Sequence, residues 1–115
     1  MDELNNKKQI LISKCMEHLS EQLKDSIPEN GSFQRHCIFF TYPGTTHDAL
    51  LWIENAAGSR YFCVGVKKKN DDRLVQHYMK RGTNDELAKY LQSDIAAEEI
   101  STSLEQLSER VDDLD

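Results

Sequence analysis

Apolar residues recur every three or four positions through the first quarter of the chain. Between Leu4 and Ile27 they form one stripe, made of Ile12, Cys15, Met16, Leu19, Leu23 and Ile27. This spacing predicts a helix with a single buried face. The helix is expected to end at Pro28 and the turn-forming residues 29–31, because the residue before a proline disfavours helical geometry.

Three short aromatic and aliphatic runs follow, at Phe33 to Tyr42, Ala49 to Asn55 and Arg60 to Lys67. The segments between them, residues 43–48 and 56–59, are short and contain glycine. Such connections favour an antiparallel meander, because parallel neighbours need much longer crossovers. We therefore predict a three-stranded antiparallel sheet.

Both faces of this sheet are partly apolar. One face collects Ile38, Phe40, Tyr42, Phe62, Val64 and Val66, and the other collects Phe33, Cys37, Phe39, Tyr61 and Cys63. Helices on one side alone would leave the second set exposed. Either helices cover both faces, or the face that carries Phe39 and Tyr61 binds a partner.

The pattern becomes helical again after the third strand. Leu74, Val75, Tyr78 and Met79 predict a short helix over 71–81, with Gly82 as its C-terminal stop. Thr83 and Glu86 then have the spacing of a capping box, which predicts that a new helix begins there.

From Ile100 the apolar spacing is that of a heptad seam, formed by Ile100, Leu104, Leu107, Val111 and Leu114. Only about two heptads follow Ile100, fewer than a coiled coil needs to be recognised from its sequence. Residues 99–115 are therefore predicted to be an acidic, heptad-patterned tail helix. It packs either on its own domain or on another chain, which would be a partner protein or, in a homodimer, a second copy of this chain.

Charge divides the chain at Gly82. Residues 60–81 hold seven cations and two acids, a balance of +5, whereas residues 82–115 hold two cations and ten acids, a balance of −8. The whole chain has a net charge of −6. The acidic balance and the few aromatic residues in the cationic stretch argue against nucleic acid binding. An acidic surface of this kind favours a protein partner with a basic surface.

The 115 residues, with 38% apolar and 30% charged composition, fit one globular domain spanning 1–115. The predicted fold class is α+β: an N-terminal helix, a three-stranded antiparallel meander and two to three C-terminal helices. The chain contains no apolar run of membrane-spanning length, and its charged start does not resemble a secretory signal. We expect a cytoplasmic protein that does not enter a membrane.

Few residues have the spacing of a chemical site. Cys15, Cys37 and Cys63 are far apart and do not form a metal-binding pair, and the four histidines are never three or four residues apart. No metal site, cofactor site or catalytic residue is predicted. His47 and Asp48 are the most enzyme-like neighbours, but the polar residues around them are those that a turn uses to bond its own backbone.

These observations favour a small, acidic, non-enzymatic protein-binding module, of the kind that inhibits a basic toxin or enzyme as an immunity protein or antitoxin does. The alternatives are a secretion or assembly chaperone, and a nucleic-acid-binding module that uses Lys67 to Arg81. The residues predicted to contact a partner are acids of the last segment, apolar residues of its seam and two aromatic residues of the sheet: Asp94, Glu98, Glu99, Glu105, Glu109, Leu104, Leu107, Val111, Phe39 and Tyr61.

Overall fold

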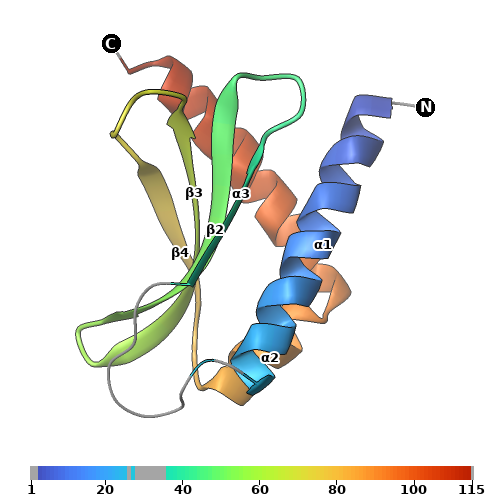
Figure 1. Ribbon diagram of the computed structural model, residues 1–115, viewed down its shortest axis with the longest axis vertical. Helices are drawn as coiled ribbons and strands as arrows, with labels where there is room; N and C mark the ends of the chain where they lie inside the picture. Colours follow the sequence, from blue (N-terminus) through green and yellow to red (C-terminus); the bar gives the residue numbers. More distant parts are fainter. Residues whose placement is uncertain (1–2, 26, 28–35, 115) are drawn as a thin grey trace.

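A computed structural model describes residues 3–25, 27 and 36–114 of the chain (Figure 1). The elements in order are α1 (Glu3–Asp25), β1 (His36–Thr41), β2 (His47–Ala56), β3 (Ser59–Lys68), β4 (Val75–Arg81), α2 (Asn84–Leu91) and α3 (Asp94–Asp112). The fold is α+β, as predicted. The predicted end of the first helix, at Pro28 to Gly31, and the start of the first strand at Phe33 lie outside the described residues.

The four strands form one antiparallel sheet in the order β1-β2-β3-β4. Each strand is joined to its neighbour by a tight connection. In the turn after β2, both Ala57 and Gly58 adopt the left-handed backbone conformation, with φ values of 51° and 81°. This conformation matches the twist of a two-residue hairpin. The predicted meander is therefore confirmed, with one strand more than expected.

The extra strand corrects the prediction of a helix over 71–81. Val75 pairs with Val66 and Tyr78 pairs with Cys63, so this segment extends the sheet beside β3. A register shift opposite Phe62 and Cys63 places a bulge in β4. The bulge breaks the alternation of apolar and polar residues that would have indicated a strand. Pairing with the otherwise open edge of β3 outweighs the weak local preference of the segment.

Gly82 does not end a helix, as the sequence predicted, but joins β4 to α2. Its amide donates a hydrogen bond to the Arg60 carbonyl oxygen at 3.1 Å. A Cβ atom at this position would lie 2.9 Å from Cβ of Glu86. Glycine is therefore required because the chain passes so close to the first turn of α2.

The three helices lie on one face of the sheet (Figure 1). Their apolar side chains join those of β2 and β3 in a single core, which includes Ile12, Leu19, Leu51, Phe62, Val64 and Leu104. The stripe predicted for the first helix is buried, including Ile27 just beyond α1. The capping box is also confirmed, since Thr83 and Glu86 each bond the backbone of the other.

Candidate functional site

α3 carries a row of acidic side chains along its solvent-facing side. Asp94, Glu98, Glu105, Glu109 and Asp112 are separated by four, seven, four and three residues, and all five are exposed. Because a helix turns once every 3.6 residues, this spacing keeps them on one face. Glu99, the remaining acid of this helix that was predicted to bind a partner, is also exposed. We call these six residues the acidic face of α3.

Three members of the acidic face are bound to other parts of the protein. The Glu105 carboxylate lies 2.6 Å from Nζ of Lys8 on α1, and this contact lowers the pKa of Glu105. Asp112 Oδ1 lies 2.9 Å from Nε2 of His47. Glu99 accepts a hydrogen bond of 2.6 Å from the Tyr90 hydroxyl. Glu105 and Asp112 therefore tie the C-terminal half of the helix to α1 and to the turn after β1.

The other three members, Asp94, Glu98 and Glu109, make no side-chain hydrogen bond or ion pair with any residue that the structure describes. We call them the unpaired acids of α3. Their side chains are exposed to solvent, so no internal contact has to be broken before they bind an external cation. Two of them, Asp94 and Glu98, lie in the first five residues of the helix.

The heptad seam packs on the protein's own domain, which decides between the two arrangements that the sequence left open. Ile100, Leu104, Leu107 and Val111 are all buried in the core beneath α3. Leu104, Leu107 and Val111, predicted to contact a partner, are therefore occupied by contacts within the chain. Their role in association stays a prediction, and it would require the helix to leave the sheet.

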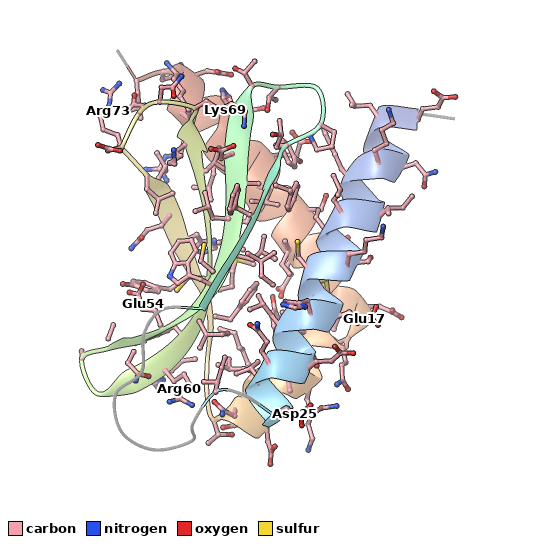
Figure 2. The ribbon with its side chains drawn as sticks, viewed as in Figure 1. Glu17, Asp25, Glu54, Arg60, Lys69 and Arg73 are labelled. Atoms are coloured by element: carbon pink, nitrogen blue, oxygen red, sulfur yellow. The ribbon has the colours of Figure 1, made fainter. Side chains whose placement is uncertain are left out.

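The cationic segment is distributed over several elements, and three of its cations contact acids of the same chain. Lys69 and Lys67 lie 2.6 and 3.6 Å from the Asp48 carboxylate, whose pKa is lowered chiefly by the hydrogen bond from Lys69. Arg73 pairs with Asp71 at 2.8 Å and lowers the pKa of Asp71 to about 2. Lys69 and Arg73 lie near the C-terminal end of α3 (Figure 2). The acids in contact with these three cations are therefore Asp48 and Asp71, and not acids of α3.

The His47 imidazole bonds two residues of α3 and not its neighbour Asp48. Its Nδ1 lies 2.7 Å from Oγ of Ser108, and its Nε2 lies 2.9 Å from Asp112. These are the residue types of a hydrolytic triad, but in such triads the carboxylate bonds Nδ1 and the serine faces Nε2. Here the serine is buried, and a carboxylate occupies the nitrogen that should activate it. The cluster therefore fastens α3 to the turn after β1. This cluster could not be predicted from the sequence, because Ser108 is 61 residues from His47.

The turn itself follows the sequence-based interpretation. The Thr45 hydroxyl donates a 2.8 Å hydrogen bond to the Tyr42 carbonyl oxygen and accepts one from the His47 amide at 3.0 Å. This polar segment thus bonds its own backbone. It positions His47 for its contacts with α3.

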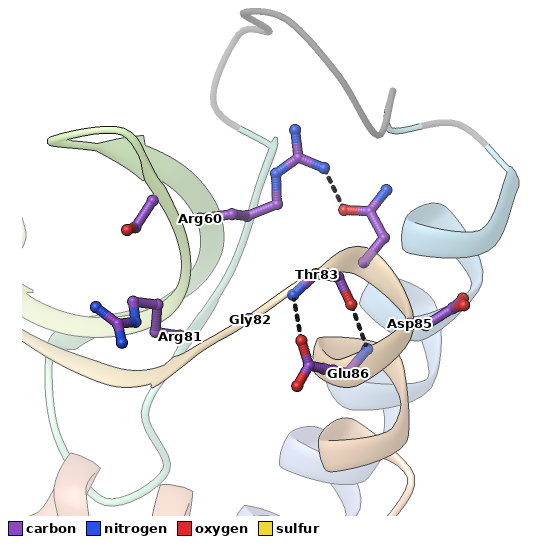
Figure 3. Close-up of a pocket in the computed structure, with 8 residues that line it drawn as sticks. Arg60, Arg81, Gly82, Thr83, Asp85 and Glu86 are labelled. Carbon is purple, nitrogen blue, oxygen red and sulfur yellow. Dashed lines mark hydrogen bonds between the residues drawn. The ribbon is translucent and has the colours of Figure 1, made fainter.

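A pocket at the start of α2 gathers two arginines, but its hydrogen-bonding groups are already used (Figure 3). The amide of Glu86 donates to the Thr83 hydroxyl, and the amide of Thr83 donates to the Glu86 carboxylate. Arg60 donates to the side-chain oxygens of Asn84 and Asn55. Because the Glu86 amide and one arginine are engaged and Glu86 brings a negative charge, the pocket is poorly suited to an anion.

Phe39 and Tyr61 share a sheet face, as predicted, but they are not neighbours. Phe39 on β1 is opposite Leu50, which is opposite Gly65, four residues beyond Tyr61 on β3. The Phe39 side chain is 69% exposed. Tyr61 instead packs on Tyr78, with 4.8 Å between ring centroids. The two residues therefore do not form one continuous aromatic patch.

The remaining candidate groups show no sign of a reactive centre. Burial raises the pKa of the Cys15 thiol to about 11, which makes it a poor nucleophile at neutral pH. Among the described residues, no three histidine, cysteine or acidic side chains are grouped as metal ligands would be. Within the same part of the chain, no helix has the length and apolar character needed to cross a membrane.

Comparisons with protein-family models, with curated proteins and with solved structures find no match to this chain.

Proposed function

We propose that this protein is a non-enzymatic binding module whose unpaired acids on α3 engage a protein partner with a basic surface. An inhibitor of a basic toxin or enzyme, acting as an immunity protein does, is the specific form we favour. The observation that carries the proposal is that Asp94, Glu98 and Glu109 are exposed and make no internal polar contact with a described residue. Glu105 and Asp112 on the same face are held by Lys8 and His47.

The acidic face contains three acids that are bound within the chain and three that are unpaired. This difference supports a binding role over a purely structural one. Acids that stabilise a fold are expected to contact cations of the same chain, as Glu105 does. Asp94 and Glu98 are four residues apart on α3, so their exposed carboxylates repel each other, and a basic partner relieves that repulsion. Such surfaces accelerate association more than they raise the final affinity.

The chain is proposed to act in the cytoplasm. Cys15, Cys37 and Cys63 are not joined by disulfides in the structure, which is consistent with a reducing compartment. Nucleic acid is the less favoured partner, because Lys67, Lys69 and Arg73 already contact acids of the same chain.

The test is the kinetics of association with a partner captured from the native cell and then purified. For the wild type, the association rate constant should fall steeply with added salt, because the Debye length shrinks from about 30 Å at 0.01 M to about 8 Å at physiological ionic strength. The double variant Glu98→Gln with Glu109→Gln should associate more slowly. Its dissociation rate should change little.

A matched control removes two exposed acids from α1 instead, by Glu17→Gln and Glu21→Gln. This variant has the same net charge but an intact acidic face on α3. Its association rate should stay closer to that of the wild type. Equal slowing of both double variants would show that only the overall charge matters, and no slowing of either would place the binding surface away from the acidic face.

A further inference from the structure

A groove of about 490 Å³ runs between α3 and β4, at the outer edge of the sheet. The walls are formed by two side chains of β4, His77 and Met79, and by side chains of α3 that include Ile95, Glu98, Glu99 and Gln106. α3 contacts both β3 and β4, and its contact with β3 is the more extensive one. Its side chains that face β4 form one wall of the groove.

β4 is an edge strand, and no described segment pairs with its outer side. An edge strand presents backbone amide and carbonyl groups that can bind another strand. The C-terminal part of β4 is protected from such pairing by the bulge near Met79 and by the charges of Lys80 and Arg81. The N-terminal part, Val75 to Tyr78, has neither a bulge nor a lysine or arginine.

The α3 wall of the groove combines an exposed apolar side chain with an acid. Ile95 is 66% exposed, although it lies on a helix whose other aliphatic residues from Ile100 to Val111 are buried. Glu98, one helical turn away, is an unpaired acid of α3. The two Cα atoms are separated by about 4.5 Å along the helix axis.

We propose that this groove binds an extended segment of the basic partner, which pairs with Val75 to Tyr78 as a fifth strand. Side chains of such a segment alternate, so its inward-facing residues lie about 6.6 Å apart. One inward apolar side chain would cover Ile95 and Met79, and the next, a lysine or arginine, would reach Glu98. The partner segment would therefore bind by strand addition, and the groove would select its side chains.

Charge complementarity favours a basic partner over a second copy of this chain. A second copy of β4 would also bring its own α3 towards the site, and the two acidic faces would repel each other. A basic segment relieves the repulsion within the acidic face. This inference rests on the proposed function, because it specifies how and where a basic partner is bound.

The test uses a fluorescently labelled synthetic peptide of about eight residues, a length typical of a strand. Every second position carries valine and lysine in turn, with threonine between them, so that one face of the strand presents alternating valine and lysine side chains. We call it the alternating peptide. A control peptide has the same composition, with its lysines and valines in two separate blocks. Binding is measured by fluorescence anisotropy and located by backbone amide NMR spectra of the full chain. We expect the alternating peptide to bind more tightly and to shift the amides of Val75 to Tyr78 most.

Three single variants distinguish the groove from general charge attraction. Ile95→Ala and Glu98→Gln should each weaken binding of the alternating peptide, by roughly tenfold for the apolar anchor. Glu17→Gln removes the same charge from α1, outside both the groove and the acidic face, and should change binding less than twofold. Ile95 and Glu98 are exposed, so these variants are expected to fold.

The inference is overturned if the two peptides bind equally, if Glu17→Gln weakens binding as much as Glu98→Gln, or if the alternating peptide does not bind. The proposed function is judged separately by the association kinetics of the natural partner. A partner that depends on Glu98 and Glu109 together, but leaves the amides of Val75 to Tyr78 unchanged, would support the acidic face and reject the groove.

Discussion

The two faces of the sheet are both apolar, yet they are protected from water in different ways. On one face, Leu51, Phe62 and Val64 are buried beneath α1 and α3. On the other face, no described helix is present, and Trp52 is nevertheless fully buried. The first face is covered by separate elements of the chain, and the second is partly covered by its own side chains.

The open face is closed around Trp52 by an aromatic and polar cluster. The indole Nε1 donates a 2.7 Å hydrogen bond to Glu54, and the Tyr78 hydroxyl donates to the second oxygen of the same carboxylate at 3.0 Å. Figure 2 shows Glu54 on the side of the sheet away from α1. The ring of Trp52 lies over Gly65, where a side chain would collide with it. The comparison teaches that a sheet face can bury a large side chain without a covering helix.

The largest effect is expected on the helix-covered face, for Leu107→Asp. Leu107 is buried beneath α3, and an uncompensated charge there is strongly unfavourable. We expect a loss of several kcal/mol and of the cooperative thermal transition, measured by circular dichroism. Ile95→Asp, on the exposed side of the same helix, should change the melting temperature little. An unchanged melting temperature for Leu107→Asp would show that this face does not depend on α3.

On the open face, Trp52→Ala should cost about 3–5 kcal/mol of unfolding free energy, as for other large buried aromatic residues. Phe39→Ala on the same face should cost less than about 0.5 kcal/mol, because the Phe39 side chain is mostly exposed. Urea denaturation of both variants measures the difference. Equal losses would contradict the view that the open face protects Trp52 selectively.

Gly65→Ala tests how closely Trp52 packs on β3. A Cβ atom at Gly65 would lie 3.0 Å from the indole ring and 2.9 Å from a methyl group of Leu74. Overpacking of this kind typically costs about 1–3 kcal/mol. Gly58→Ala is unsuitable as a control because Gly58 has a positive φ. Combining Gly65→Ala with Trp52→Ala should remove most of the Gly65→Ala penalty, and strictly additive losses would refute the contact.

The smallest effect is expected for the contribution of Asp48 to folding stability at low pH. Asp48 and Lys67 are paired across strands on the open face, and Asp48 also contacts Lys69. Because the pKa of Asp48 is lowered in the folded protein, its contribution is present above the ordinary aspartate pKa of about 3.9. That contribution is lost as the pH falls through this value towards the lower folded pKa.

Asp48→Asn should therefore flatten the decline in stability between about pH 5 and pH 2, by less than about 1 kcal/mol for such a surface pair. Urea midpoints measured across this range for the variant and the wild type provide the comparison. A variant curve parallel to that of the wild type would show that this pair does not contribute to the acid sensitivity of the open face.

Local signals in the sequence were sufficient where the interacting residues are close along the chain. The apolar stripe of α1, the Thr83 and Glu86 capping box and the hairpin connections depend on neighbours within a few residues, and the structure contains all three. The burial of the heptad seam was one of two open possibilities. A stripe shows which side of a helix is apolar, but not what covers it.

The errors arose where contacts between distant residues decide the structure. β4 was predicted to be a helix because its bulge disrupts the alternating pattern, while its pairing with β3 cannot be read locally. The bond between His47 and Ser108 and the Lys8 contact that engages Glu105 also join distant segments. For this reason the sequence could identify five acids of α3 as candidates but could not separate the three that are unpaired.

The position of α3 also sets the order in which the protein can fold during synthesis. This helix is the last element of the described chain, yet Ile100, Leu104 and Val111 lie at the centre of the core. The hairpins of the sheet can form as soon as they leave the ribosome, but Phe62 and Val64 stay only partly covered until Val111 has also emerged. At about 5–20 residues per second, the roughly fifty residues between Val64 and Val111 take a few seconds to synthesise. During that interval the nascent sheet exposes an apolar surface, which makes it a substrate for molecular chaperones.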